Sequence, residues 1–130
     1  MEESIFTKII NGEIPCHKIY EDDKTFAFLD IHPKTPGHTL IVPKKQVEFL
    51  WDLDDEDYDA VMRAAKKVAR RIKKVLDFEY VGEMVFGIEV PHTHVHVFGF
   101  NSIEEFRFIP AIGTVPNHEA LAATAKKLAF

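Results

Sequence analysis

The sequence predicts an α+β domain, a mainly antiparallel five-stranded sheet with one long helix and short terminal helices. Five short β-rich runs, bounded by turn residues, lie before and after the middle of the chain. A single long amphipathic segment separates the two groups, and short helical patterns stand at both ends. Strands on either side of one helix favour antiparallel pairing, because a parallel sheet needs a crossover between successive strands.

The first part of the chain is expected to form a short helix followed by three strands. Ser4 is a suitable N-cap for one or two helical turns, and Gly12 stands where that helix could end. Two β-rich runs then flank the turn-prone residues 21–23, which predicts a hairpin. Residues 32–37 contain two prolines and a glycine, so they are expected to form a loop that leads into a strand ending at Pro43.

A long amphipathic helix is predicted from about Glu56 to Leu76. Its apolar side chains recur at the i, i+3, i+4 and i+7 spacing of one helix face. These positions are Tyr58, Val61, Met62, Ala65, Val68, Ala69, Ile72, Val75 and Leu76. Acidic residues precede basic ones along the segment, a polarity that complements the helix dipole. We interpret the basic residues as a solvated face rather than a nucleic-acid surface, because no aromatic residues are interleaved with them.

The remainder of the chain is expected to add two strands and a final helix. The strands are predicted over residues 80–89 and 93–100, joined through Val90 and Pro91. Asn117 is a suitable cap for an Ala/Leu-rich helix that follows it.

Composition narrows the class of protein. A chain of 130 residues that is 46% hydrophobic fits one domain, expected over residues 1–130. No apolar run is long enough for a membrane span, the start of the chain is acidic rather than signal-like, and Cys16 is the only cysteine, so we expect a cytoplasmic protein. A net charge of -5 argues against broad nucleic-acid binding. We therefore expect no nucleic-acid or membrane partner.

Three histidines at alternate positions carry the functional argument. On a strand, His92, His94 and His96 project from one face at intervals of roughly 6.6 Å. Val95 and Val97 then fall on the opposite face, where they can pack against the core. Such clustering is a poor choice for packing alone, because the imidazoles repel one another when they are protonated.

Two kinds of chemistry suit this row. The first is a metal site, since neutral imidazoles bind zinc, although the roughly 13 Å from His92 to His96 on a strand is awkward for three ligands of one ion. The second is nucleophilic catalysis at phosphorus, in which the central His94 attacks. The flanking imidazoles would donate hydrogen bonds to phosphoryl oxygens and protonate the leaving group.

The segment from His92 to Phe98 resembles the signature of the histidine triad (HIT) superfamily, His-x-His-x-His followed by two apolar residues. The likeness extends to SIFTKIINGEIP, EDD, FAFLDIHPKTPGHTLIVPKK and EVPHTHVHV, in that order along the chain. It implies the compact α+β HIT-like fold, a homodimer, and transfer of a nucleoside monophosphate group to His94. His92 and His96 match the flanking positions of the triad, and His38 matches a fourth histidine that supports it through hydrogen bonds.

The resemblance also implies a nucleotide site without a cofactor. Its positions in this chain are Phe6, Ile9, Ile14, Phe28, Leu29, Asp30, Ile31, Gly87 and Glu89. Asp30 matches a carboxylate that accepts hydrogen bonds from ribose hydroxyls, a role that suits an acceptor-only group. No metal is expected, because Ser4, Thr7 and Gln46 occupy positions where some members have zinc-binding cysteines and a histidine.

Two departures concern the phosphate. Ile88 replaces a glutamine common in the family, and Glu89 stands where a hydroxyl residue often helps the phosphate. The resemblance implies a phosphoramidase-like hydrolase or transferase acting on nucleoside 5'-phosphoramidates or related nucleotide phosphate esters, through a nucleotidyl-histidine intermediate. The departures keep open a nucleotide-binding module with little or no turnover. A dinucleoside polyphosphate hydrolase and a histidine-ligated metal protein are further alternatives. The sequence leaves the base and the leaving group open.

Overall fold

The computed structural model describes residues 2–111 and 113–130. Its elements follow in the order α1 (Ile5–Ile10), β1 (Lys18–Glu21), β2 (Thr25–Leu29), β3 (Thr39–Pro43), the 3-10 helix η1 (Leu50–Asp52), α2 (Asp55–Val75), β4 (Tyr80–Met84), β5 (Val95–Phe100), α3 (Ile103–Arg107) and α4 (His118–Leu128).

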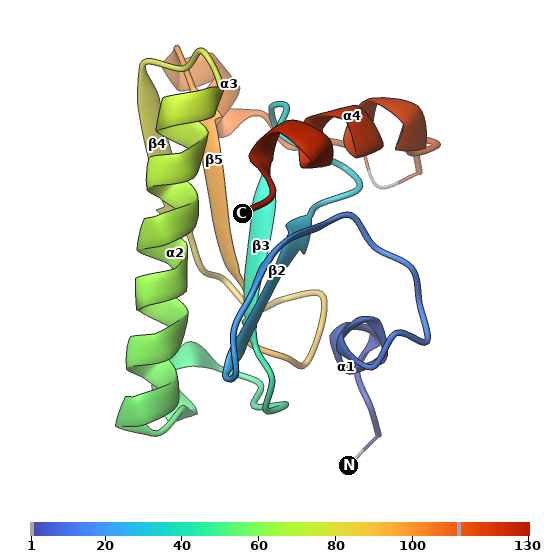
Figure 1. Ribbon diagram of the computed structural model, residues 1–130, viewed down its shortest axis with the longest axis vertical. Coiled ribbons are helices and arrows are strands. Elements are labelled where there is room, and N and C mark those ends of the chain that lie inside the picture. Colours follow the sequence, from blue (N-terminus) through green and yellow to red (C-terminus); the bar gives the residue numbers. More distant parts are fainter. Residues whose placement is uncertain (1, 112) are drawn as a thin grey trace.

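The five strands form one antiparallel sheet in the order β1-β2-β3-β5-β4 (Figure 1). This confirms the α+β class, the hairpin around residues 21–23 and the antiparallel sheet that the sequence predicts. In the centre of the sheet, Leu40 of β3 lies opposite His96 of β5, and Met84 of β4 lies opposite the same histidine from the other side. The candidate site is therefore mounted on the middle of the sheet.

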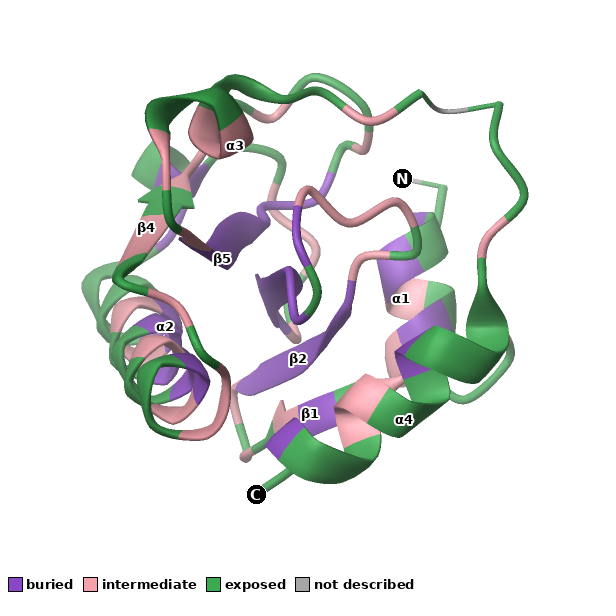
Figure 2. Cartoon of the chain, turned by 90° about the horizontal axis from the view of Figure 1, so that it is seen from above, coloured by how far each residue is buried: buried purple, intermediate pink, exposed green. Residues whose placement is uncertain are grey.

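Each face of the sheet has its own core. On one face, side chains of α2 and α4 pack against β-strand residues such as Ile41, Val95 and Val97. On the other, Phe6 and Ile9 of α1 pack with four sheet residues, Phe26, Phe28, Leu40 and Val42. Figure 2 shows the buried strands between α2 on one side and α1 on the other. The alternation of Val95 and Val97 with the histidines is thus as predicted.

The long helix α2 begins and ends as its charges suggest. The side chain of Asp54 accepts a hydrogen bond from the backbone N–H of Asp57, which caps the N-terminus. Acidic residues fill the first turn and Lys73 and Lys74 the last, each favourable to the helix dipole. The apolar face is as predicted except at its first position, where Tyr58 is exposed and its neighbour Asp57 is buried.

The strand expected over residues 93–100 starts only at Val95, so the prediction that all three histidines stand on one strand is wrong. Continuing the β3–β5 register would place Pro43 opposite Thr93, and proline has no N–H to extend the ladder. The Thr93 N–H instead donates to the carbonyl of Val47, 2.7 Å away, and the His92 N–H donates to that of Val90. Only His96 lies within β5.

Two further differences concern chain segments near the site. The strand expected over residues 80–89 ends at Met84, and a loop containing Gly87, with φ +65°, follows it. The short helices η1 and α3 were not predicted from the sequence. Across the part of the chain that the structure describes, no helix has both the length and the apolar composition needed to cross a bilayer.

Candidate active site

The ring of His94 is held in one tautomer by its own backbone neighbourhood. Its Nδ1 lies 2.8 Å from the carbonyl oxygen of His92. A carbonyl can only accept, so the neutral ring carries its proton on Nδ1 and leaves the lone pair of Nε2 bare. Phe6 packs edge-on against the ring with centroids 5.1 Å apart, and only 3% of His94 is exposed. The ring is therefore oriented and nearly dry, as a nitrogen nucleophile requires.

Both ring nitrogens of His92 are already engaged within the protein. Nε2 lies 2.7 Å from the carbonyl of Pro43 and donates to it, and Nδ1 accepts from the hydroxyl of Ser4 at 2.7 Å. The side chain is fully buried. His92 therefore has no N–H left for a phosphoryl oxygen, contrary to the role expected of a flanking imidazole. It positions the peptide whose carbonyl holds His94.

A polar cluster at the start of α1 supports His92. Ser4 caps that helix by accepting from the N–H of Thr7, while its own N–H donates to Oε1 of Gln46 at 2.8 Å. The hydroxyl of Thr7 donates to the same oxygen at 2.9 Å. For Ser4, Thr7 and Gln46 the sequence resemblance implies a departure from zinc-binding members, and here these residues form a hydrogen-bonded support for His92.

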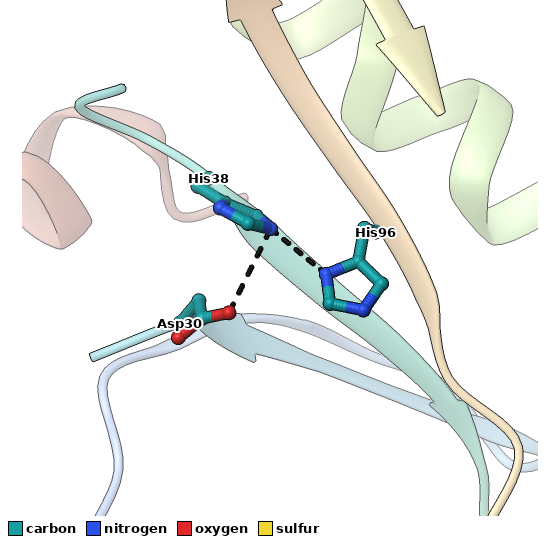
Figure 3. Close-up of side chains that lie close together, drawn as sticks. All are labelled: Asp30, His38 and His96. Carbon is teal, nitrogen blue, oxygen red and sulfur yellow. Dashed lines mark hydrogen bonds and ion pairs between the residues drawn. The ribbon is translucent and has the colours of Figure 1, made fainter. Parts of the chain in front are cut away.

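His38, which directly precedes β3, and His96 of β5 form a directional hydrogen-bonded pair (Figure 3). The backbone N–H of Lys34 donates to Nδ1 of His38 at 3.0 Å, so the proton of the neutral ring must sit on Nε2. That Nε2–H donates to Nδ1 of His96, again at 3.0 Å. The remaining nitrogen of His96, Nε2, consequently carries a proton.

The Nε2–H of His96 is a buried donor without a hydrogen-bond partner among the described residues. Leaving such a donor unsatisfied costs about 1–3 kcal/mol, and unpaired groups of this kind occur where a ligand supplies the partner. The ring centroid of His96 lies 5.1 Å from that of His94. The unprotonated Nε2 of His94 and the Nε2–H donor of His96 thus belong to neighbouring rings.

Burial keeps the imidazoles of His38, His92 and His96 neutral. It lowers the pKa of His38 to about 3, with help from neighbouring His96 and Lys34. It lowers the pKa of His96 to about 4, assisted by His94 and Lys34. The pKa of His92 is also lowered, mainly by burial. Near neutral pH these rings therefore act as hydrogen-bond donors and acceptors rather than cations.

Asp30 stands at the edge of the site, just beyond the end of β2. Its Oδ1 accepts from the N–H of His32 at 2.9 Å, and its Oδ2 lies 3.7 Å from Nε2 of His38 (Figure 3). Burial raises the pKa of this carboxyl, and the charge of Glu89 adds to the rise. Oδ2 accepts no hydrogen bond at that distance, which leaves it open to a ligand hydroxyl.

A cavity of about 240 Å³ brings together most of the residues that the sequence predicts for nucleotide binding. Those that line it are Phe6, Ile9, Ile14, Phe28, Leu29, Asp30, Ile31 and Glu89, together with the catalytic candidates His94 and His96. Leu29 contributes to its wall although its side chain belongs to the core beneath α2. The cavity is apolar at the α1 end and polar at the histidines.

Gly87 lies apart from this cavity. It lines a hollow of about 50 Å³ that also contains His94 and Phe86. A larger cavity of about 460 Å³ adjoins the first one and shares Asp30, His32, Glu89 and His96 with it. Exposed Glu89 therefore borders both larger cavities.

The residues present do not fit a metal ion. Side-chain atoms of Asp30, His38 and His96 lie within 4.8 Å of one another, which makes them candidate ligands. A metal at Nε2 of His38 would force the ring proton onto Nδ1, where it would oppose the N–H of Lys34. Nε2 of His38 is therefore protonated and donates a hydrogen bond, whereas a metal ligand would need a lone pair on this atom.

Two contributors were not identified from the sequence. Phe86 stacks on His96 with centroids 4.9 Å apart and planes 12° from parallel. Lys34 acts through its backbone N–H, which sets the tautomer of His38, so no side-chain pattern could reveal it. Phe86 falls in a segment that was expected to be a strand, and no pattern in the sequence indicated that its ring would stack on His96.

Comparison with known proteins gives a consistent result. The family model described as HIT domain matches residues 11–102. An uncharacterized HIT-like protein of Borreliella burgdorferi is 43% identical over 104 residues, 75% of each chain. Adenosine 5'-monophosphoramidase HNT1 of Saccharomyces cerevisiae is 41% identical over 96 residues, 72% of this chain and 60% of that one. A crystal structure of a Hit-like protein from Bartonella henselae superposes with a TM-score of 0.83 at 35% identity, covering 97% of this chain and 94% of that one.

Proposed function

The chain belongs to the HIT domain family, and we propose that it is a nucleotidyl hydrolase or transferase that cleaves nucleoside 5'-phosphoramidates or related nucleotide phosphate esters. The single observation that carries the proposal is the bare Nε2 of His94, fixed by the Nδ1–H bond to the carbonyl of His92. A neutral, oriented imidazole nitrogen in a dry site is suited to attack phosphorus. The similarity to adenosine 5'-monophosphoramidase HNT1 supports the same substrate class.

The reaction proceeds in two displacements. Nε2 of His94 forms a bond to phosphorus while the P–N bond of the phosphoramidate breaks, and its electron pair goes to the departing nitrogen. That nitrogen takes a proton from a water molecule as it leaves, while the Nε2–H of His96, whose Nδ1 is held by the Nε2–H of His38, donates a hydrogen bond to the developing negative charge. The hydroxide that remains then attacks the nucleotidyl-His94 intermediate: its oxygen bonds to phosphorus, the bond from phosphorus to Nε2 of His94 breaks, and the electron pair of that bond returns to Nε2. The products are the amine and the nucleoside monophosphate.

The nucleoside occupies the cavity of about 240 Å³ beside α1. The base packs among apolar side chains such as Phe6, Ile9 and Phe28, and the ribose hydroxyls donate to Asp30. Phosphorus then stands between His94 and His96. His92 and Ser4 orient the nucleophile without touching substrate.

A second candidate function, nucleotide binding with little turnover, is favoured by one observation. The carboxylate of Glu89 borders both cavities and would repel an anionic phosphoryl group. Tight nucleoside monophosphate binding without turnover across a substrate panel would support it over the hydrolase.

The test compares wild-type protein with His94→Ala on adenosine 5'-phosphoramidate. We expect kcat to fall at least about a thousandfold, because the attacking group is removed, while adenosine monophosphate still binds. Product formation by chromatography and binding by calorimetry measure the two effects. Hydrolysis by His94→Ala at the wild-type rate would falsify the mechanism.

We further propose that the protein acts as a cytoplasmic homodimer. The family resemblance suggests the dimer, and the single cysteine, Cys16, suits a reducing compartment. Light scattering with size-exclusion chromatography measures the oligomeric state; a monomer at micromolar concentration would contradict it.

A further inference from the structure

The cavity of about 460 Å³ beside the proposed nucleoside site has walls of a different character. Five apolar residues line it: Met84, Phe86, Ile88, Ile109 and Pro110. They come from β4, the loop after it, and the segment that follows α3. Two of them are unusually open, since Ile88 is 80% and Ile109 83% exposed. Large apolar side chains that are exposed together around a cavity indicate a binding surface.

The position of this cavity relates it to the departing group. It shares His96 with the proposed nucleoside cavity, but His94 lines only the latter of the two. In an in-line displacement the attacking and leaving atoms lie on opposite sides of phosphorus. A leaving group that departs away from His94 and past the Nε2–H of His96 therefore enters the larger cavity.

The charges around this cavity disfavour an anionic leaving group. Asp30 and Glu89 both line it. Lys34 is the one lysine or arginine among the lining residues that the structure describes, and its Nζ already donates to the carbonyls of Phe106 and Phe108, at 2.8 and 2.6 Å. A polyphosphate chain would meet two carboxylates and an ammonium group committed elsewhere.

We propose that this cavity is the leaving-group subsite and that Ile88 and Ile109 make the protein selective for amines with neutral, apolar substituents. The inference rests on the proposed function and specifies its substrate class. Apolar substituents on the departing nitrogen cover Ile88 and Ile109, and burial of these apolar side chains from water favours binding. Dinucleoside polyphosphates are poor substrates for the same reasons.

The test uses two substrates with the same nucleotide, unsubstituted adenosine 5'-phosphoramidate and its N-benzyl derivative, with diadenosine tetraphosphate as a third. Wild-type protein should favour the benzyl compound in kcat/KM by about tenfold or more. The double variant Ile88→Ser, Ile109→Ser, which removes both apolar side chains, should lose that preference. Ile103→Ser, which alters an exposed isoleucine that does not line the cavity, should retain it.

The outcomes separate the inference from the function on which it rests. If all three proteins turn over both phosphoramidates with the same ratio, or if the tetraphosphate is the best substrate, the subsite is wrong and the hydrolase stands. If no compound is turned over, the hydrolase fails, and calorimetric binding of the two intact phosphoramidates decides the subsite. A benzyl preference in binding that the double variant loses would still support it, and equal affinities would overturn it.

Discussion

Single hydrogen bonds to ring nitrogens determine what each histidine of the site can do. The carbonyl of His92 leaves Nε2 of His94 bare, and the N–H of Lys34 sets His38 as the donor to His96. The residue types were predictable, because alternation in the sequence identified the triad and the family resemblance added His38. The roles of His92 and Lys34 were not predictable, since they depend on backbone carbonyl and N–H groups, which every residue except proline carries in full.

Ser4 is the residue whose change should test the support of His92. Ser4→Ala removes both the cap of α1 and the hydroxyl that donates to Nδ1 of His92. We expect the free energy of unfolding to fall by about 1–3 kcal/mol and kcat to fall with it. Urea denaturation and steady-state kinetics measure the two quantities. Ser4→Thr keeps the hydroxyl and should restore most of both; equal loss in the two variants would argue against the hydrogen bond.

At the scale of elements, local patterns predicted the helices and strands better than their ends. Ser4, Asp54 and Asn117 cap α1, α2 and α4 as side-chain chemistry suggests. The start of β5 was missed because it depends on Pro43, which lies 52 positions before Val95 and cannot donate to the ladder. A strand boundary of this kind depends on the partner strand, and the local sequence around the boundary carries no information about that partner.

The close approach of Phe78 to Gly99 tests how β5 packs against the end of α2. A Cβ added to Gly99 would overlap the side chain of Phe78, which follows α2 and packs against the core between that helix and the sheet. Gly99→Ala should therefore lower the free energy of unfolding by about 1–3 kcal/mol. Gly113→Ala, where a Cβ meets nothing within 4 Å, is the matched control and should stay within about 0.5 kcal/mol. Similar midpoints in urea for both variants would contradict the close approach.

For the molecule as a whole, the buried imidazoles of the site make the free energy of unfolding depend on pH. The pKa values of His38 and His96 are about 3 and about 4 in the folded protein, against about 6.5 for an unfolded chain. Between pH 6.5 and 4 the unfolded state therefore holds more protons. Stability should fall with falling pH in that window, by up to about 1.4 kcal/mol per pH unit for each ring.

Urea unfolding at several pH values measures this dependence. Asp30 has the opposite effect on the free energy of unfolding at the acid end of the pH profile, because burial raises the pKa of its carboxyl. The double variant His38→Gln, His96→Gln should flatten the profile, whereas His118→Gln, which changes an exposed histidine outside the site, should leave most of it. A flat wild-type profile from pH 6.5 to 4.5 would contradict neutral, buried imidazoles.

The central claim is that His94 carries the nucleotide during turnover. Wild-type protein mixed with excess adenosine 5'-phosphoramidate can be quenched in alkaline denaturant, which preserves P–N bonds, and then digested and sequenced by mass spectrometry. The mechanism predicts an added adenosine monophosphate group on the peptide that contains residues 92–98, assigned to His94 and absent from His94→Ala. Turnover with the adduct on another residue, or with none under conditions where a phosphohistidine standard survives, would contradict it.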